Sequence, residues 1–251
     1  MNIDSVTQKT IDYVKPIWKN FSHTDSRRIF LPFKVHNKNQ GDVFVSIGQT
    51  ANNGFGYFKT TLVNSENINL GHELLFINPE NRANMVGFDI FVFPNFRKKN
   101  RLGELLRLAS IMEMMENKSS SMSIHSVDSA VYFHSKYKFE PAITSFEIRN
   151  RALDTISSDI SEGFEDFALR AKKIIADVEK NKANAAVQRA LCSDTNVLVK
   201  DYIDQALKDG KPEVKHPFNW GIDMILTKDK IVQCKDYFNS LFEQHAIDYR
   251  I

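Results

Sequence analysis

The segment at residues 87–106, GFDIFVFPNFRKKNRLGELL, has the composition of an anion-binding site. An apolar stretch leads into the turn Arg97–Arg101, in which four of five residues are basic, and a helix is expected to begin at about Leu102 or Gly103. The first N–H groups of a helix have no partner inside the helix, and the helix dipole adds a partial positive charge there. Such an end suits a pyrophosphate, and Gly103 would let a phosphate approach the backbone closely. The same turn could instead be a solvated surface loop or a nucleic-acid contact.

Two carboxylates within the expected strands are candidates for chemistry. Asp89 lies within an apolar stretch, where a carboxylate is costly unless it is paired or solvated. It alternates with Phe91 and Phe93, so we expect the three side chains to share one face of a strand. Glu73 lies on an earlier strand and is the second candidate. Asp89 could equally be a structural partner of an arginine or lysine.

A metal site is not expected. The seven histidines show no paired ligand spacing such as His-Glu-x-x-His, and neither a Gly-x-Ser-x-Gly elbow nor a Walker loop is present. The two cysteines, Cys192 and Cys234, form no disulfide framework, and we expect them to be packing residues.

Short segments rich in β-branched and aromatic residues precede the basic turn, and turn-forming residues separate them. We expect strands at 29–35, 43–47, 57–63, 73–77 and 85–93, after a helix at 3–21. Apolar residues at helical spacing then predict a helix from about residue 102 to 115. A strand at 122–127, a helix at about 128–138 and a strand at 143–148 are expected to follow.

After about residue 154 the pattern is helical, with apolar stripes at 160–178 and 199–207, a late strand at 220–226 and a final amphipathic helix at 231–245. The expected fold is mixed α/β (α+β), with a mostly antiparallel central sheet flanked by helices and an added C-terminal helical region. We expect a core at 1–155, a helical insertion or lobe at 156–216, and a final strand and helix at 217–251 that return to the core.

The basic turn and its flanks resemble the signature of the GNAT superfamily of N-acetyltransferases. In that signature a strand ending in a Val-x-Pro-like step leads to an Arg/Gln-x-x-Gly-x-Gly/Ala loop and a helix, and the loop amides hold the coenzyme A pyrophosphate. Here Val92-Phe93-Pro94 matches the strand end, and residues 98–103 lie where the loop should be. Two residues depart from the pattern: Lys98 replaces the usual Arg or Gln, and Arg101 replaces the first Gly.

A second match follows about thirty residues later. The GNAT helix resembles Ala-x-x-x-Tyr-x-x-x-Gly-Phe, and its Tyr often protonates the departing CoA thiolate. Ala130 and Phe139 match this pattern, Lys138 stands at the Gly, and His134 stands at the Tyr. An imidazole with a pKa near neutrality can supply that proton. His134 could equally be a polar residue on a partly exposed helix face.

The resemblance implies an acyltransferase that moves an acetyl or other acyl group from acyl-CoA to an amine by direct attack. Backbone groups near Val92 and Phe93 would pair with the pantetheine arm, and an N–H of the same strand would stabilise the oxyanion. The pyrophosphate would be held by the residues of the loop and the helix start, namely Lys98, Lys99, Asn100, Arg101, Leu102, Gly103 and Glu104. The catalytic candidates are then His134 as the acid and Asp89 or Glu73 as the base.

Two alternatives stay open at this point. The chain could bind acyl-CoA without catalysis or use an unusual donor. In a different class, it could bind nucleic acid through Arg97–Arg101. The formal net charge of +2 argues against nucleic acid and against an anionic membrane surface.

The sequence predicts a cytoplasmic protein, because it shows neither a signal peptide nor a membrane-spanning segment. The start MNIDSVTQKT lacks the pattern of a signal peptide, and the apolar run at 85–93 is far shorter than the roughly 20 residues of a spanning helix. We expect acyl-CoA and an amine as partners, with no metal, no membrane and no nucleic acid. A homodimer is compatible with the sequence.

Overall fold

The computed structural model describes residues 30–37, 40–52, 55–77, 83–97, 101–210, 218 and 221–251, so the helix expected at 3–21 lies outside the described part. The chain divides into two compact units. The first holds the described residues up to Met122 together with Thr227–Ile251, and the second is Ser123–Leu226. The domain boundaries expected near residues 155 and 216 stay a prediction.

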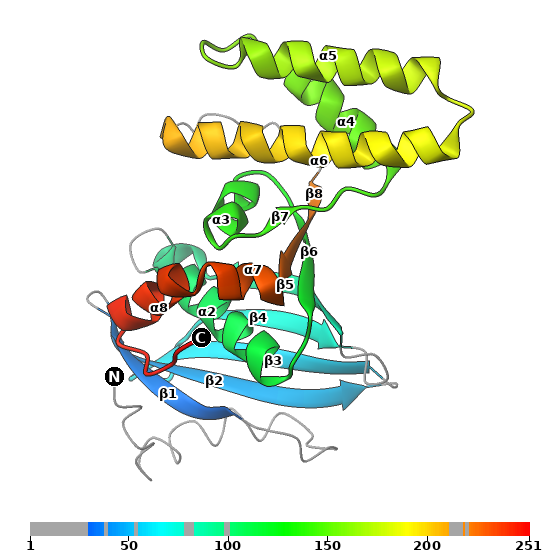
Figure 1. The fold of residues 1–251 in the computed structure, drawn as a ribbon. Helices are drawn as coiled ribbons and strands as arrows, with labels where there is room; N and C mark the ends of the chain where they lie inside the picture. Colours follow the sequence, from blue (N-terminus) through cyan, green and yellow to red (C-terminus); the bar gives the residue numbers. More distant parts are fainter. Residues whose placement is uncertain are drawn as a thin grey trace. The chain divides into compact units, whose positions relative to one another are not determined.

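Five strands form an antiparallel meander in the first unit, as the sequence predicts (Figure 1). In chain order they are β1 (Phe30–Asn37), β2 (Gly41–Asn52), β3 (Phe55–Asn64), β4 (Asn69–Ile77) and β5 (Asn84–Val92). Alternate residues of a strand point to opposite faces. The core face carries the buried side chains Val35, Val43, Val45, Leu62, Leu75 and Met85.

Helix α2 (Leu102–Glu116) packs against β3, β4 and β5, and almost all of its residues up to Met114 are buried. This helix is the one predicted from the apolar spacing. The first unit also contains α7 (Lys228–Gln233) and α8 (Lys235–Gln244). The prediction of a single helix at 231–245 is therefore wrong, because two helices cover this segment. The backbone of Cys234 is not helical (φ −103°, ψ 22°), and its N–H closes α7 by donating to the Lys230 carbonyl.

The second unit combines short strands with a helical region (Figure 1). Its strands, in the spatial order β6-β8-β7, are β6 (Ser121–Ser126), β8 (Ile222–Thr227) and β7 (Glu140–Pro141); β6 and β8 each extend slightly past the unit's boundary. Its helices are α3 (Ala130–Lys136), α4 (Phe146–Ser157), α5 (Glu165–Lys180) and α6 (Ala185–Lys208), of which the last three pack on one another. The late strand is confirmed as β8, which pairs antiparallel with β7.

The strand expected at 143–148 is wrong, because a helix cap lies inside that segment. The Ser145 hydroxyl accepts a hydrogen bond from the Ile148 N–H, and Glu147 places a negative charge in the first turn of α4. Both features stabilise a helix start. The buried residues of α4 then follow a helical spacing through to Ile156. The described chain thus has the predicted mixed α/β class, with mostly antiparallel strand pairing and an added helical region.

Candidate functional site

The strand, turn and helix that carry the expected anion site are all present in the first unit. The strand β5 ends at Val92, a short 3₁₀ turn follows at Pro94–Phe96, and α2 begins at Leu102 with Arg101 as its N-cap residue. Three of the predicted binding residues, Lys98, Lys99 and Asn100, lie outside the described residues.

Arg101 has a left-handed backbone, with φ 50° and ψ 25°. Residues other than glycine rarely adopt this conformation, because the Cβ atom crowds the following carbonyl oxygen. Lys138, which stands at the Gly of the second motif, also has a positive φ, of 66°. These are the two positions at which the sequence replaces a glycine of the GNAT patterns. The backbone keeps the conformation that suits glycine at both of them.

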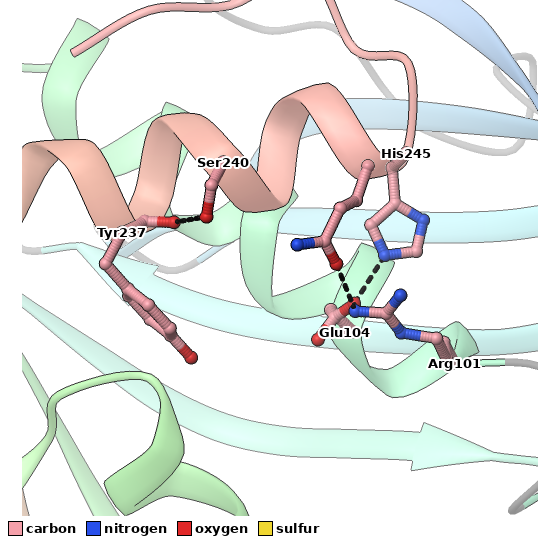
Figure 2. Close-up of polar contacts among 6 residues, drawn as sticks. Arg101, Glu104, Tyr237, Ser240 and His245 are labelled. Carbon is pink, nitrogen blue, oxygen red and sulfur yellow. Dashed lines mark hydrogen bonds and ion pairs between the residues drawn. The ribbon is translucent and has the colours of Figure 1, made fainter.

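The side chains at the start of α2 form a polar cluster with the end of α8 (Figure 2). Arg101 makes an ion pair with Glu104 and donates from Nη2 to Gln244 Oε1, at 3.1 Å. Glu104 Oε1 also lies 2.5 Å from His245 Nε2. Sequence reasoning missed Gln244 and His245, because they follow Arg101 by more than 140 residues and no local pattern marks them.

The backbone of the first turn of α2 is also tied to Arg101. The Arg101 carbonyl accepts from the N–H groups of Glu104, at 3.1 Å, and Leu105, at 3.2 Å. Leu102 is buried and Gly103 is half-buried beside them. Nearby, burial raises the pKa of the Tyr237 phenol, and the Glu104 carboxylate raises it further. The Tyr237 carbonyl accepts from the Ser240 hydroxyl at 2.7 Å (Figure 2).

The end of β5 is held by its neighbours. The Phe93 N–H donates to the Leu70 carbonyl at 3.1 Å, and the Val92 carbonyl accepts from Arg97 Nε at 2.7 Å. Gly71 pairs with Val92 across the strands, and a Cβ atom at Gly71 would lie 2.5 Å from the Phe91 carbonyl oxygen. Only glycine permits this close approach at the strand end.

The two candidate bases lie on opposite faces of the sheet. Glu73 pairs with Ile90, whereas Asp89 pairs with the next residue of β4, Leu74. Since paired residues share a face and consecutive residues alternate, the sheet separates the two carboxylates. One small acceptor could therefore not contact both.

Glu73 faces α2 and is 1% exposed. Its Oε1 lies 3.0 Å from Arg107 Nη1, and burial raises the pKa of Glu73 to about 7, an effect that Arg107 opposes. Asp89 is exposed on the other face, and its Oδ2 lies 3.1 Å from His72 Nε2. The partner of Asp89 is thus a histidine, where an arginine or lysine was the expected alternative.

His134 belongs to the second unit and is 4% exposed, so the expectation of a partly exposed helix face is wrong. Its ring lies 5.0 Å from that of Phe133 and 5.6 Å from that of Phe139, measured between centroids. The aromatic neighbours come from the same motif that placed a histidine at this position. They exclude water from most of the imidazole.

Cys192 is buried and burial raises the pKa of its thiol, which fits the expected packing role.

Among the described residues, no three His, Cys, Asp or Glu side chains gather as metal ligands would. None of the described helices is long and apolar enough to cross a membrane.

No protein family profile matches the chain, and no curated protein matches it. A solved tandem GNAT protein from the clavulanic acid biosynthesis pathway is 13% identical, over 37% of this chain and 30% of its own, with a TM-score of 0.33. GNAT-family acetyltransferases from Elizabethkingia anophelis, with acetyl-CoA bound, and from Staphylococcus aureus are 17% and 20% identical. Both cover 36% of this chain, and 57% and 56% of their own, with TM-scores of 0.30 and 0.31. This chain therefore spans less than two thirds of each of them, and the solved structures that it resembles are GNAT-family proteins.

Proposed function

We propose that this protein is an acyltransferase that moves an acetyl or other acyl group from acyl-CoA to an amine. The observation that carries the proposal is the left-handed backbone of Arg101 at the N-cap of α2. Glycine adopts such a φ without strain, so an arginine that keeps this φ in place of the motif glycine supports the match to the motif at position 101. This backbone geometry supports the proposal that the turn before α2 binds an anion.

The donor would bind through its phosphates at the start of α2. The N–H groups of the first turn and the positive end of the helix dipole attract the pyrophosphate. The side chains of Lys98, Lys99 and Arg101 add positive charge to the same turn. Arg101 already contacts Glu104 and Gln244. A phosphate would displace the neutral Gln244 amide from Arg101, since a phosphate carries the opposite charge and can accept two parallel hydrogen bonds from the guanidinium.

The acceptor amine attacks the thioester carbonyl carbon, forming a C–N bond while the C–S bond breaks. Of the two candidate bases, the exposed Asp89 can meet a substrate from solvent, whereas Glu73 is buried against Arg107. The proposed role of His134, which is to return a proton to the CoA thiolate, rests on its place in the second motif alone. A His134→Tyr variant, which restores the motif residue, should then retain activity that His134→Gln loses.

Calorimetric titration of acetyl-CoA and CoA tests the donor site. We expect micromolar binding by the unchanged chain and at least about tenfold weaker binding by Lys98→Ala/Lys99→Ala/Arg101→Ala, since a hydrogen bond to a charged group contributes about 1.5–3 kcal/mol. Arg151→Ala is the matched control, because Arg151 is an exposed arginine in an ion pair with Glu147 in the other unit.

Absence of binding by either nucleotide would contradict acetyl transfer. Longer acyl-CoA donors would then be titrated, together with DNA and RNA at several salt concentrations. Steeply salt-dependent nucleic-acid binding without CoA binding would favour the alternative function of the basic turn.

A further inference from the structure

Histidine–aspartate pairs recur in the described chain, and one of them lies beside the end of β5. The pairs, with their N–O distances, are His36–Asp42 at 3.1 Å, His72–Asp89 at 3.1 Å and His125–Asp223 at 2.8 Å. The first two lie in the first unit, on strands of one sheet, and the third lies in the second unit. Only His72–Asp89 includes a residue that the sequence marks as a candidate base.

The strand register explains why His72 and Asp89 meet. His72 pairs with Phe91, and Leu74 pairs with Asp89, so His72 and Asp89 are diagonal neighbours on the same face of two antiparallel strands. The His72 side chain is 23% exposed and that of Asp89 is 45% exposed. The pair can therefore be reached from solvent while its geometry is set by the sheet.

The hydrogen bond orients the imidazole for proton removal. An ionised carboxylate only accepts hydrogen bonds, so the nitrogen facing Asp89, Nε2, carries the proton. Nδ1 then has a free lone pair and can accept a proton. A carboxylate that fixes the histidine tautomer and stabilises the imidazolium is a recurrent arrangement in acyl transfer.

Aromatic rings continue from this pair toward the basic turn. The His72 and Phe91 ring centroids are 5.8 Å apart, and those of Phe91 and Phe93 are 5.1 Å apart. The Arg97 guanidinium lies 5.2 Å from the Phe91 centroid. An amine held at His72 of β4 would thus lie beside β5, the strand that leads to the predicted phosphate site.

The charged groups on this face come from several strands. Besides Asp89 on β5 and Arg97 after it, the strand register places Lys59 of β3 on this face, and farther along it Lys34, His36 and Asp42 of β1 and β2. Lys34 and His36 both pair with Asp42, with Lys34 Nζ 3.4 Å from Asp42 Oδ2 and His36 Nδ1 3.1 Å from Asp42 Oδ1. Asp89 is the anion in contact with the His72 ring.

We propose that His72, oriented by Asp89, removes the proton from the acceptor amine, an inference that rests on the proposed function. One N–H bond of the amine breaks as its proton passes to His72 Nδ1, and the amine nitrogen forms the C–N bond. The C–S bond breaks with its electron pair on sulfur, the thiolate takes up a proton, and His72 returns its own proton to solvent. Asp89 is the positioning residue of this step.

The test follows thiol release from acetyl-CoA by the full chain with a panel of primary amines: spermidine, glucosamine, tyramine and a lysine-containing peptide. His72→Gln should lower kcat/KM by about 10²–10⁴, the usual contribution of a general base. It should also alter the pH profile of kcat/KM, because a glutamine side chain cannot take up a proton. Asp89→Asn should cause a smaller loss. Added imidazole should partly restore His72→Ala.

His36→Gln is the matched control, because His36 has the same kind of partner on the same sheet and should leave kcat/KM unchanged. Nitrogen chemical shifts should also show the Nε2–H tautomer of His72 in the unchanged chain. Full activity and an unaltered pH profile in His72→Gln would overturn the proposal and leave acyl transfer standing. Binding of acetyl-CoA without thiol release by any of these amines would overturn both the role of His72 and the proposed acyl transfer. Only the binding of acyl-CoA would then stand.

Discussion

The guanidinium of Arg107 and the carboxylate of Glu73 form an ion pair in the interior of the first unit, with Nη1 3.0 Å from Oε1. Arg107 lies on α2 and Glu73 on β4, so the pair joins the helix that carries the candidate site to the sheet. The Arg107 Nη1 also contacts the Ser110 hydroxyl at 3.3 Å. The position of the α2 N-terminus therefore depends in part on charges that are removed from water.

Replacing only one partner of this pair should destabilise the first unit strongly. Arg107→Leu leaves a buried carboxyl without its cation, and the expected loss in the free energy of unfolding is about 3–5 kcal/mol. Urea unfolding at pH 7 measures it. The double variant Glu73→Leu/Arg107→Leu should recover most of the loss, because an apolar pair avoids the desolvation cost of both charges. Equal losses in the single and double variants would contradict this account.

Glu113 of α2 should make stability depend on pH. It is fully buried, Asn117 Nδ2 donates to its Oε2 at 2.7 Å, and burial raises its pKa to about 8 from 4.5. The folded state then holds a proton that the unfolded state releases between these values. The contribution of Glu113 to stability is complete below about pH 4.5 and is lost as the pH rises through about 8.

Glu113→Gln should flatten this dependence, since an amide does not titrate. Each unit of pKa shift corresponds to about 1.4 kcal/mol. The stability of the variant relative to the unchanged chain should therefore increase as the pH is raised from about 4.5 to about 8. Thermal unfolding at several pH values measures the difference. Glu243→Gln, an exposed position on α8 in the same unit, is the control and should leave the pH dependence as it is.

Gly221→Ala should destabilise the second unit. Gly221 has φ +83°, and a Cβ atom there would lie 2.3 Å from His125 Nε2 and 2.8 Å from Val127 Cγ1. Gly163 has the same φ of +83° but open space around a Cβ atom. Gly163→Ala should therefore cost only the backbone strain, about 1–2 kcal/mol, and Gly221→Ala should cost distinctly more. Urea unfolding followed by far-UV circular dichroism compares the stabilities of the two variants. Equal losses of stability would argue against the contact with His125.

Lys138→Gly should stabilise the second unit slightly. A lysine at φ 66° carries a strain of about 1–2 kcal/mol, which exceeds the entropy that a glycine adds to the unfolded chain, about 0.4–1 kcal/mol. The expected gain is up to about 1 kcal/mol. Lys136→Gly, at the last residue of α3, should instead cost up to about 1 kcal/mol, the value for glycine inside a helix. A loss of stability at both positions would show that the positive φ at Lys138 carries no strain.

Much of the first unit could be predicted because its signals are local. Turn-forming residues mark the ends of β1–β5, and apolar residues at helical spacing mark α2. The errors arose where a few residues outweigh the composition around them. Ser145 caps α4 inside a segment that is apolar enough for a strand, and the non-helical Cys234 divides the final helix in two.

The site was predictable as far as its motif extends along the chain. The basic turn, the helix after it and the two positions where a glycine is replaced can be read from the sequence, because they depend on neighbouring residues. The contacts of the candidate side chains depend on how the chain folds. The tertiary structure buries Glu73 against Arg107, places Asp89 beside His72 and brings Gln244 and His245 to Arg101 and Glu104. Strand register and helix packing bring together residues that are distant in sequence, and no local pattern encodes which of them meet.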